Sequence, residues 1–352
     1  MFVKPQLKQL RPYVPGKSAA AIKEEYGLDD IIKLASNENP YGASPKAHEV
    51  FGEFDAFNLY PDGAAKKLKQ GLADFLEVQP NQLLIGAGAD EVIQMLSRAI
   101  LKTGDRIVQG SPTFIQYAHH ATIEDAQVVS VPLKDGAYDL EALAKKIDEK
   151  TKIVWICNPN NPTGTYVSHS QLEAFLASVP KTVLVAVDEA YVEYVAAADF
   201  PDALALLSKY PNLFILRTFS KIYGLASFRV GYGIGSPALV QELEVARLPF
   251  NTTAVSQKVA AAALKDQAFV ADCHNKNRVG MAAYESFFAS KNVPFYPSET
   301  NFIFATLPDA QKIASTLESK GLIIRPFPEG IRITIGTEEQ NEQLLAALSE
   351  IL

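Results

Sequence analysis

Lys221 is the first residue whose type and setting could do chemistry. It lies in the segment FSKIYG, at 219–224, among apolar and small side chains. A lysine in such surroundings has a lowered pKa, and its neutral amine can attack a carbonyl carbon to form a Schiff base. Most lysines are instead surface charges. The apolar setting, with Arg229 eight residues further on, favours a nucleophile.

A glycine-rich turn, GAGADE at 86–91, follows one apolar run of the sequence. The free N–H groups of the helix that it leads into could bind a phosphate. Glu91 occupies the place of the last glycine of a GxGxxG motif, which disfavours a dinucleotide site and therefore a nicotinamide oxidoreductase. Taken alone, the segment is also compatible with an ordinary strand-to-helix turn.

Two further polar motifs follow apolar runs. NPNNPTG at 158–164 contains two prolines and a closing glycine, which would fix the loop and present its asparagine side chains at set positions. DEAY at 188–191 puts Asp188 at the mouth of a buried strand, where a carboxylate is costly to ionise unless a cation or donors face it. The alternatives are a capped turn for the first motif and a solvated loop start or helix N-cap for the second.

The elements that must position these side chains alternate along residues 40–245. Short apolar runs predict strands at 82–85, 106–109, 127–132, 153–157, 183–187, 213–216 and 230–234. Helical patterns lie between them, for example at 91–101 and 139–146. This alternation is typical of an α/β fold, and the continuous apolar runs indicate strands covered by helices on both faces. We expect a mostly parallel seven-stranded sheet that binds its ligand at the carboxyl ends of the strands.

The pattern changes near Pro249. Helices are predicted at 253–264, 266–290 and 310–320, and strands at 300–307 and 331–335, which together indicate a smaller α+β domain. The proline-rich opening predicts an extended arm with one short helix near 19–26, packed against this smaller domain. The predicted regions are therefore an arm at 1–39, a large ligand-binding domain at 40–248 and a small domain at 249–352.

These groups together meet the needs of one cofactor. Pyridoxal phosphate requires a lysine for its aldehyde, an acid facing the pyridinium nitrogen, donors to the ring hydroxyl, an aromatic side chain against the ring, and an anion site for the phosphate. Groups of these kinds follow the predicted strands, namely Lys221, the acid Asp188, the asparagines of 158–164 and the turn at 86–91. We expect pyridoxal 5′-phosphate in the large domain.

Eight motifs occur in the order seen in histidinol-phosphate aminotransferases. They are KLASNENPYG, YPDG, GAGADE, SPTF, NPNNPTG, DEAY, SKIYGLASFRVGY and RITIG, and the chain resembles that family from RPYVPGK near its start to its last strand. The resemblance implies a homodimeric transaminase that moves an amino group between L-histidinol phosphate and 2-oxoglutarate in histidine biosynthesis. The opening residues contain no apolar core like that of a signal peptide, so a cytoplasmic location is expected.

The resemblance also implies roles for single residues. Lys221 matches the Schiff-base lysine and proton shuttle, and Asp188 matches the acid that keeps the pyridine nitrogen protonated. Asn161 and Tyr191 match the donors to the ring's phenolic oxygen, and Phe114 matches the residue stacked on the ring, which is tyrosine in some relatives. The residues that match the phosphate site are Ala89, Asp90, Thr218, Ser220 and Arg229.

The remaining implied roles concern the substrate and a second subunit. Tyr60 resembles the tyrosine that reaches the phosphate of the neighbouring subunit's cofactor. Arg325, Arg332 and Tyr13 resemble the groups that bind the substrate's anionic end and the carboxylate of glutamate. The stretch 325–330 is shorter than the glycine-rich segment of many relatives. The resemblance therefore implies the type of reaction more directly than it implies the substrate.

Composition narrows the choice of function. The net charge of −7 and the pI near 5.4 argue against nucleic-acid binding, and the longest apolar run, 259–264, is far shorter than a membrane span. The two cysteines and five histidines lack metal-ligand spacing, so no metal is expected. An aromatic-amino-acid transaminase is the nearest alternative, and a phosphothreonine decarboxylase is more remote. A non-catalytic sensor of the cofactor fold would need a DNA-binding segment or a missing lysine.

Overall fold

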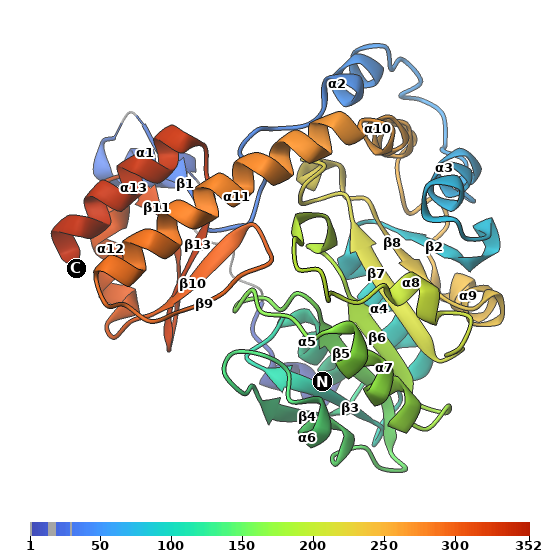
Figure 1. Cartoon of the computed structure of the whole chain (residues 1–352). Helices are drawn as coiled ribbons and strands as arrows, with labels where there is room; N and C mark the ends of the chain where they lie inside the picture. The colour runs from blue at the N-terminus through green and yellow to red at the C-terminus, as the bar shows by residue number, and fades with distance from the viewer. Residues whose placement is uncertain (1, 13–18, 29) are drawn as a thin grey trace.

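The computed structural model describes residues 2–12, 19–28 and 30–352. Figure 1 shows a large part built around a central sheet, a smaller part at the left of the view, and the long helix α11 (Gln267–Ser290) running between them. Among the described residues, no helix combines the length and the apolar composition that crossing a membrane would require.

A seven-stranded sheet forms the centre of the large part, in the order β2-β8-β7-β6-β5-β3-β4. All neighbouring strands are parallel except that β8 runs antiparallel to β2 and β7. The predicted α/β fold with a mostly parallel sheet is thereby confirmed. The strands are β2 (Leu83–Gly86), β3 (Arg106–Ser111), β4 (Gln127–Pro132), β5 (Thr151–Cys157), β6 (Leu184–Asp188), β7 (Leu213–Thr218) and β8 (Gly231–Ile234).

Helices pack around this sheet through apolar faces. In α4, Val92, Ile93, Met95 and Leu96 are buried at helical spacing, and the helix contacts β2, β7 and β8. Every residue of β6 is buried, which explains its continuous apolar run. The helices of the large part are α2 (Pro45–Gly52), α3 (Lys66–Leu76), α4 (Ala89–Ile100), α5 (Gln116–Ile123), α6 (Leu140–Ala144), α7 (His169–Ser178), α8 (Ala203–Leu206), α9 (Pro237–Leu243) and α10 (Ala254–Leu264).

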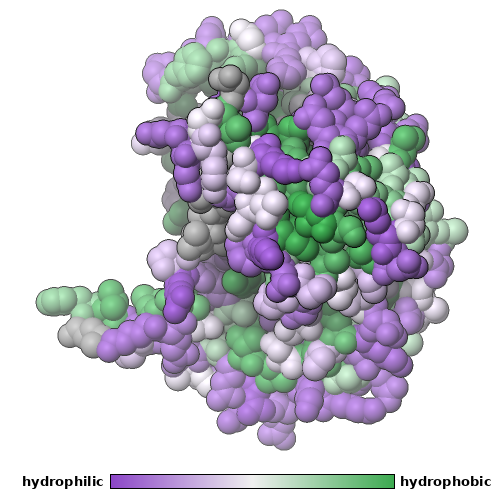
Figure 2. All heavy atoms as spheres, turned by 90° about the vertical axis from the view of Figure 1, so that its left-hand side faces the viewer, coloured by the Kyte–Doolittle hydropathy of each residue, from purple (hydrophilic) through white to green (hydrophobic). Residues whose placement is uncertain are grey.

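The small part has its own sheet and core. Antiparallel strands lie in the order β12-β13-β10-β9, and α11, α12 and α13 contribute to a separate cluster of buried apolar side chains. Figure 2, which views the molecule from this side, shows a largely hydrophilic surface with apolar side chains gathered near the middle. The elements are β9 (Phe295–Tyr296), β10 (Phe302–Thr306), β12 (Arg325–Phe327), β13 (Gly330–Thr334), α12 (Ala310–Glu318) and α13 (Glu338–Ile351).

The two cores meet within α11. Helix α10 packs on α2 and α3, and its Val259 belongs to the core of the large part, as does Cys273 of α11. Met281, two turns further along α11, belongs to the core of the small part. We therefore propose that the parts divide within α11 rather than at residue 249, because the apolar face of α10 is buried against the large part.

The opening segment contacts both parts. The short helix α1 (Ala19–Tyr26) forms where it was predicted, and β1 (Ile32–Lys33) pairs in parallel with β11 (Leu322–Ile323) of the small part. The 3-10 helix η1 (Pro5–Gln9) instead contacts α5, where Lys4 and Gln6 donate hydrogen bonds to the carbonyl oxygen of Ile123. The predicted packing on the small domain is corrected for residues 4–9, because the C-terminal carbonyls of α5 offer acceptors there.

Candidate active site

A cavity of about 680 Å³ lies at the carboxyl ends of the parallel strands, between the two parts. Neighbouring parallel strands bring their ends to one edge of the sheet, so residues far apart in sequence meet there. A second cavity of about 610 Å³, between α2, α3 and α10, contains none of the predicted site residues. Those that line the first cavity are Ala89, Asp90, Phe114, Asn161, Asp188, Tyr191, Thr218, Ser220, Lys221, Arg229, Arg325 and Arg332.

Lys221 follows β7 and is half-buried in this cavity. Burial, and next the positive charge of Arg332, lower the pKa of its amine to about 8. Its Nζ lies 5.5 Å from the centre of the Tyr191 ring. The amine is therefore neutral more often near pH 7 than that of a surface lysine, as a nucleophile requires.

Asp188 ends β6 and is 3% exposed. The hydroxyl of Tyr117 donates a 2.5 Å hydrogen bond to Oδ2, and the N–H of Ala190 donates to Oδ1 at 3.1 Å. Burial raises the pKa of Asp188 to about 6, although these donors favour the ionised form. Tyr117 stacks on Trp155 with 4.5 Å between ring centroids. The sequence did not single out Tyr117, because a tyrosine on a buried helix face is ordinarily a core residue.

Close backbone approaches shape the start of α4. Gly88, the residue before the helix, has a φ of +80°, and a Cβ at this position would lie 2.5 Å from Nη2 of Arg229. A Cβ on Gly231 of β8 would lie 2.4 Å from the backbone nitrogen of Ala89. The two glycines keep the first N–H groups of α4 beside the arginine.

Side-chain donors complete this corner of the cavity. Thr218 Oγ1 donates to Ser220 Oγ at 3.0 Å, and Arg229 Nη1 donates to the same oxygen at 3.3 Å. Asp90 Oδ2 lies 3.5 Å from Arg229 Nη2. A helix N-terminus with an arginine and two hydroxyls is suited to a phosphate group.

Tyr191 is fixed by a residue of the opening segment. Asn37 Nδ2 donates to the hydroxyl oxygen of Tyr191 at 2.8 Å, so the hydroxyl proton is available to another acceptor. Asn37 has a left-handed φ of 55° and exchanges hydrogen bonds of 3.0 and 3.1 Å with Thr334 of β13. The motif KLASNENPYG contains Asn37, but the pattern of this motif does not by itself indicate a role for that residue.

Arg332 is held rigidly in β13. Its Nη1 donates to Asn161 Oδ1 at 2.5 Å, and its Nη2 donates to the carbonyl oxygen of Ala35 at 2.8 Å. The guanidinium lies 5.2 Å from the ring centre of Phe302 and 5.7 Å from that of Phe327. The arginine thereby links Asn161 of the large part to the small part.

The antiparallel register of β12 and β13 places Arg325 directly opposite Arg332. Side chains at paired positions lie on the same face of a sheet, and both arginines line the cavity. Like charges in this position repel each other, so an anion between them would be stabilising. The sequence showed two arginines near a turn, but it did not show this register.

The remaining two predicted residues are Tyr60 and Tyr13. Tyr60 is 82% exposed, outside the cavity, and stacks on Phe250 with 4.7 Å between ring centroids. Tyr13 lies outside the described residues, so its predicted place beside the substrate is not tested.

The sequence of the chain matches the family model for aminotransferase class I and II over residues 29–348. The chain belongs to this family. A histidinol-phosphate aminotransferase 1 of Bacillus cereus is 53% identical to it, covering 100% of this chain and 97% of the relative. A histidinol-phosphate aminotransferase 2 of Bacillus cereus is 51% identical, covering 99% of this chain and 96% of the relative.

Solved structures show the same fold. The histidinol-phosphate aminotransferase of Sinorhizobium meliloti, solved in complex with pyridoxal-5′-phosphate, is 27% identical to this aminotransferase with a TM-score of 0.92, covering 99% of this chain and 97% of the other. An aspartate aminotransferase of Thermus thermophilus with maleate is 18% identical with a TM-score of 0.86, covering 100% of each chain. The latter likeness concerns the fold alone.

The cavity of this aminotransferase fits pyridoxal phosphate. A lysine of lowered pKa, a buried carboxyl group and a tyrosine hydroxyl face one space. The start of α4, kept open by Gly88 and Gly231, offers an anion site at its edge. These are the groups that the cofactor requires.

Proposed function

We propose that this chain is a histidinol-phosphate aminotransferase that uses pyridoxal 5′-phosphate to convert L-histidinol phosphate and 2-oxoglutarate into imidazole acetol phosphate and L-glutamate, in histidine biosynthesis. The observation that supports the substrate most strongly is the pairing of Arg325 with Arg332 in a cavity that also contains Lys221. Two guanidinium groups on one face suit a dianionic phosphate, because each can make paired charge-assisted hydrogen bonds.

Two side chains, Lys221 and Asp188, act directly in the proposed reaction. Pyridoxal phosphate, when bound, supplies a ring that accepts electrons from the reacting carbon of the substrate. Lys221 holds the cofactor through Nζ and, once released, moves the proton at the substrate's Cα as general base and then acid. The carboxylate of Asp188, oriented by Tyr117, keeps the proton on the ring nitrogen.

The remaining site residues bind and orient the cofactor and the substrate. Tyr191 and Asn161 act as donors to the ring's phenolic oxygen, and Phe114 stacks on the ring. Ala89, Asp90, Thr218, Ser220 and Arg229 hold the cofactor phosphate. Arg325, Arg332 and Tyr13 bind the anionic end of the substrate and the carboxylate of glutamate.

We further propose a cytoplasmic homodimer with shared active sites. Tyr60 and Phe57 are 82% and 81% exposed, and the stack of Tyr60 on Phe250 brings a second exposed segment, which includes Leu248, beside them. Exposed apolar side chains gathered in this way are typical of a protein interface. Both cysteines are unpaired and buried, as expected in a reducing compartment.

Half-reactions followed by the cofactor's absorbance test the proposal. L-histidinol phosphate should convert the bound cofactor to its amine form, and 2-oxoglutarate should restore it. The variant Lys221→Ala should fold and yet lose conversion by several powers of ten, because the cofactor link and the proton shuttle disappear together. Near-normal conversion in this variant would refute the role of Lys221, and no change in the wild-type spectrum would refute the substrate.

A further inference from the structure

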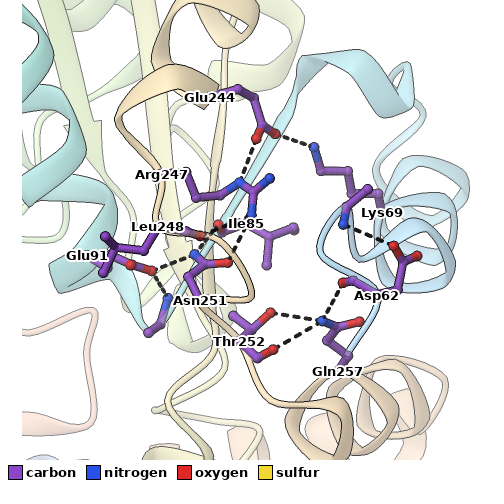
Figure 3. Close-up of polar contacts among 12 residues, drawn as sticks. Asp62, Lys69, Ile85, Glu91, Glu244, Arg247, Leu248, Asn251, Thr252 and Gln257 are labelled. Carbon is purple, nitrogen blue, oxygen red and sulfur yellow. Dashed lines mark hydrogen bonds and ion pairs between the residues drawn. The ribbon is translucent and has the colours of Figure 1, made fainter. Parts of the chain in front are cut away.

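A chain of polar contacts runs from the glycine-rich turn at 86–91 to α3. It passes through Asn251, the residue after Phe250, on whose ring Tyr60 stacks. Figure 3 shows Glu91, Asn251, Arg247, Glu244 and Lys69 pointing toward one another, from α4, from the segment that follows α9, and from α3. The proposed catalytic roles use none of these side chains.

Glu91 closes the turn that precedes α4. Gly88, the N-cap residue, has no side chain to accept from the free N–H groups of the helix. Glu91 instead reaches back over the turn, and its Oε2 accepts from the N–H of Ala87 at 2.6 Å. This carboxylate therefore fixes the loop immediately before Ala89, the first residue of the anion site.

Asn251 contacts the same carboxylate oxygen from the opposite side. Its Nδ2 donates to Glu91 Oε2 at 2.6 Å and to the carbonyl oxygen of Ile85 at 3.0 Å. The residue before it, Phe250, has a left-handed φ of 54°, which costs free energy for a bulky side chain. The contacts of Asn251 hold the backbone at this point and therefore the ring on which Tyr60 stacks.

The far end of the chain anchors it to α3. Arg247 Nη1 donates to Asn251 Oδ1 at 3.3 Å, and Arg247 Nε donates to Glu244 at 2.6 Å. Glu244 also accepts from Lys69 Nζ at 2.7 Å. The side chains of Arg247 and Lys69 are each only 17% exposed, so solvent screens these charges less than it would on an open surface.

We propose that Glu91 and Asn251 are positioning residues for two contacts with cofactor phosphates. In their own subunit they fix the anion site at the start of α4. Through Phe250 they also position Tyr60, which contacts the cofactor phosphate of the neighbouring subunit. The proposal rests on the proposed dimer, in which Tyr60 crosses the interface. One short chain of hydrogen bonds thereby sets the geometry of both active sites.

Cofactor binding by the apoenzyme tests the first half of the proposal without any substrate. Pyridoxal phosphate binding can be followed by quenching of Trp155, the only tryptophan of the sequence. Asn251→Ala and Glu91→Leu should each weaken binding about tenfold or more, as expected for loss of a hydrogen bond to a charged group. Glu91→Gln keeps an oxygen that can accept both bonds and should stay within about threefold of wild type.

A matched control is Glu173→Gln. Glu173 lies in α7, away from the cavity, and its carboxylate forms an ion pair with Lys209. This variant should bind the cofactor like wild type. Wild-type affinity in both Asn251→Ala and Glu91→Leu would overturn the proposal. Equal weakening in Glu91→Gln and Glu91→Leu would also overturn it, because the accepting oxygen would then not be what matters.

Hybrid dimers test the second half. In the first hybrid, an Asn251→Ala chain is paired with a Lys221→Ala chain, so the working site has an altered turn and receives an unaltered Tyr60. In the second, a wild-type chain is paired with a Lys221→Ala, Asn251→Ala chain, so the working site has a normal turn and receives Tyr60 from the altered chain. Both should turn over more slowly than a hybrid of wild type with Lys221→Ala.

Normal turnover in either hybrid would overturn the link between the two sites. Phe250→Leu, which leaves the polar chain intact, should slow only the second arrangement. A further hybrid pairs a wild-type chain with a Lys221→Ala, Tyr60→Ala chain. If its turnover were also normal, Tyr60 would not cross the interface, and the dimer proposal itself would fail. A failure of the link and a failure of the shared site are therefore distinguishable.

Discussion

Asp188 and Lys221 are both driven toward their neutral forms by burial. The pKa of the carboxyl group rises to about 6 and that of the amine falls to about 8. Transamination needs the neutral amine, but it also needs an ionised acid opposite the ring nitrogen. The hydrogen bonds from Tyr117 and Ala190 favour that ionised state. Tyr117 is therefore part of the acid's function, although it does not line the cavity itself.

Asp188→Asn should bind the cofactor and react slowly, because a neutral amide cannot stabilise a protonated ring nitrogen. Tyr117→Phe should have a smaller effect that grows as the pH falls, because the loss of a donor raises the pKa of Asp188 further. Single-turnover rates measure both effects. A rate for Asp188→Asn within about threefold of wild type, less than one step of 1.36 kcal/mol in barrier, would assign the carboxylate another role.

The pH dependence of cofactor capture should report Lys221. With a pKa of about 8, about a tenth of the amine is neutral at pH 7, against fewer than about one in a thousand for an unperturbed lysine. The rate at which apoenzyme takes up pyridoxal phosphate should therefore rise with pH and level off above about 8. Arg332→Met removes a positive charge that lowers this pKa, so its midpoint should move upward. A wild-type rate still rising beyond pH 10 would contradict the assignment.

At the scale of elements, the anion site depends on how closely β8 approaches α4. Gly231→Ala would place a methyl group 2.4 Å from the backbone nitrogen of Ala89, where only main-chain movement can relieve the clash. We expect a loss of about 1–3 kcal/mol in the free energy of unfolding and weaker cofactor binding. Gly52→Ala, at a position with nothing within 4 Å, is the matched control. Denaturant unfolding measures the stability of both variants, and cofactor titration measures their affinity for the cofactor. Equal stability and equal affinity in the two variants would refute the steric argument.

The order of the elements was predictable because local pattern and sheet geometry agree. Strands buried on both faces give unbroken apolar runs, and parallel strands bring Asp188, Asn161 and Lys221 to one edge. Such local patterns do not show which distant segments contact each other. The contact of Asn37 with Tyr191 and the register of Arg325 with Arg332 depend on how the small part closes over the sheet, so only the structure revealed them.

At the scale of the whole molecule, the exposed Tyr60 has a function only if a second subunit receives it. Mixing Tyr60→Ala with Lys221→Ala should restore partial activity, because one site of the hybrid carries both lesions and the other carries neither. The test requires Tyr60→Ala to be nearly inactive by itself. No recovery from demonstrated hybrids would place Tyr60 in its own subunit's site.

Selectivity for the substrate's phosphate tests the central claim most directly. The measurement is kcat/KM for L-histidinol phosphate, histidinol and phenylalanine, in wild type and in Arg325→Ala. Charged hydrogen bonds contribute ~1.5–3 kcal/mol each, so two arginines should favour the phosphorylated substrate over histidinol by about two to four powers of ten. Arg325→Ala should remove much of that preference and change the rate with histidinol little, because histidinol carries no anionic group. Equal losses for all three substrates, or a wild-type preference for phenylalanine, would contradict the account and favour an aromatic-amino-acid transaminase.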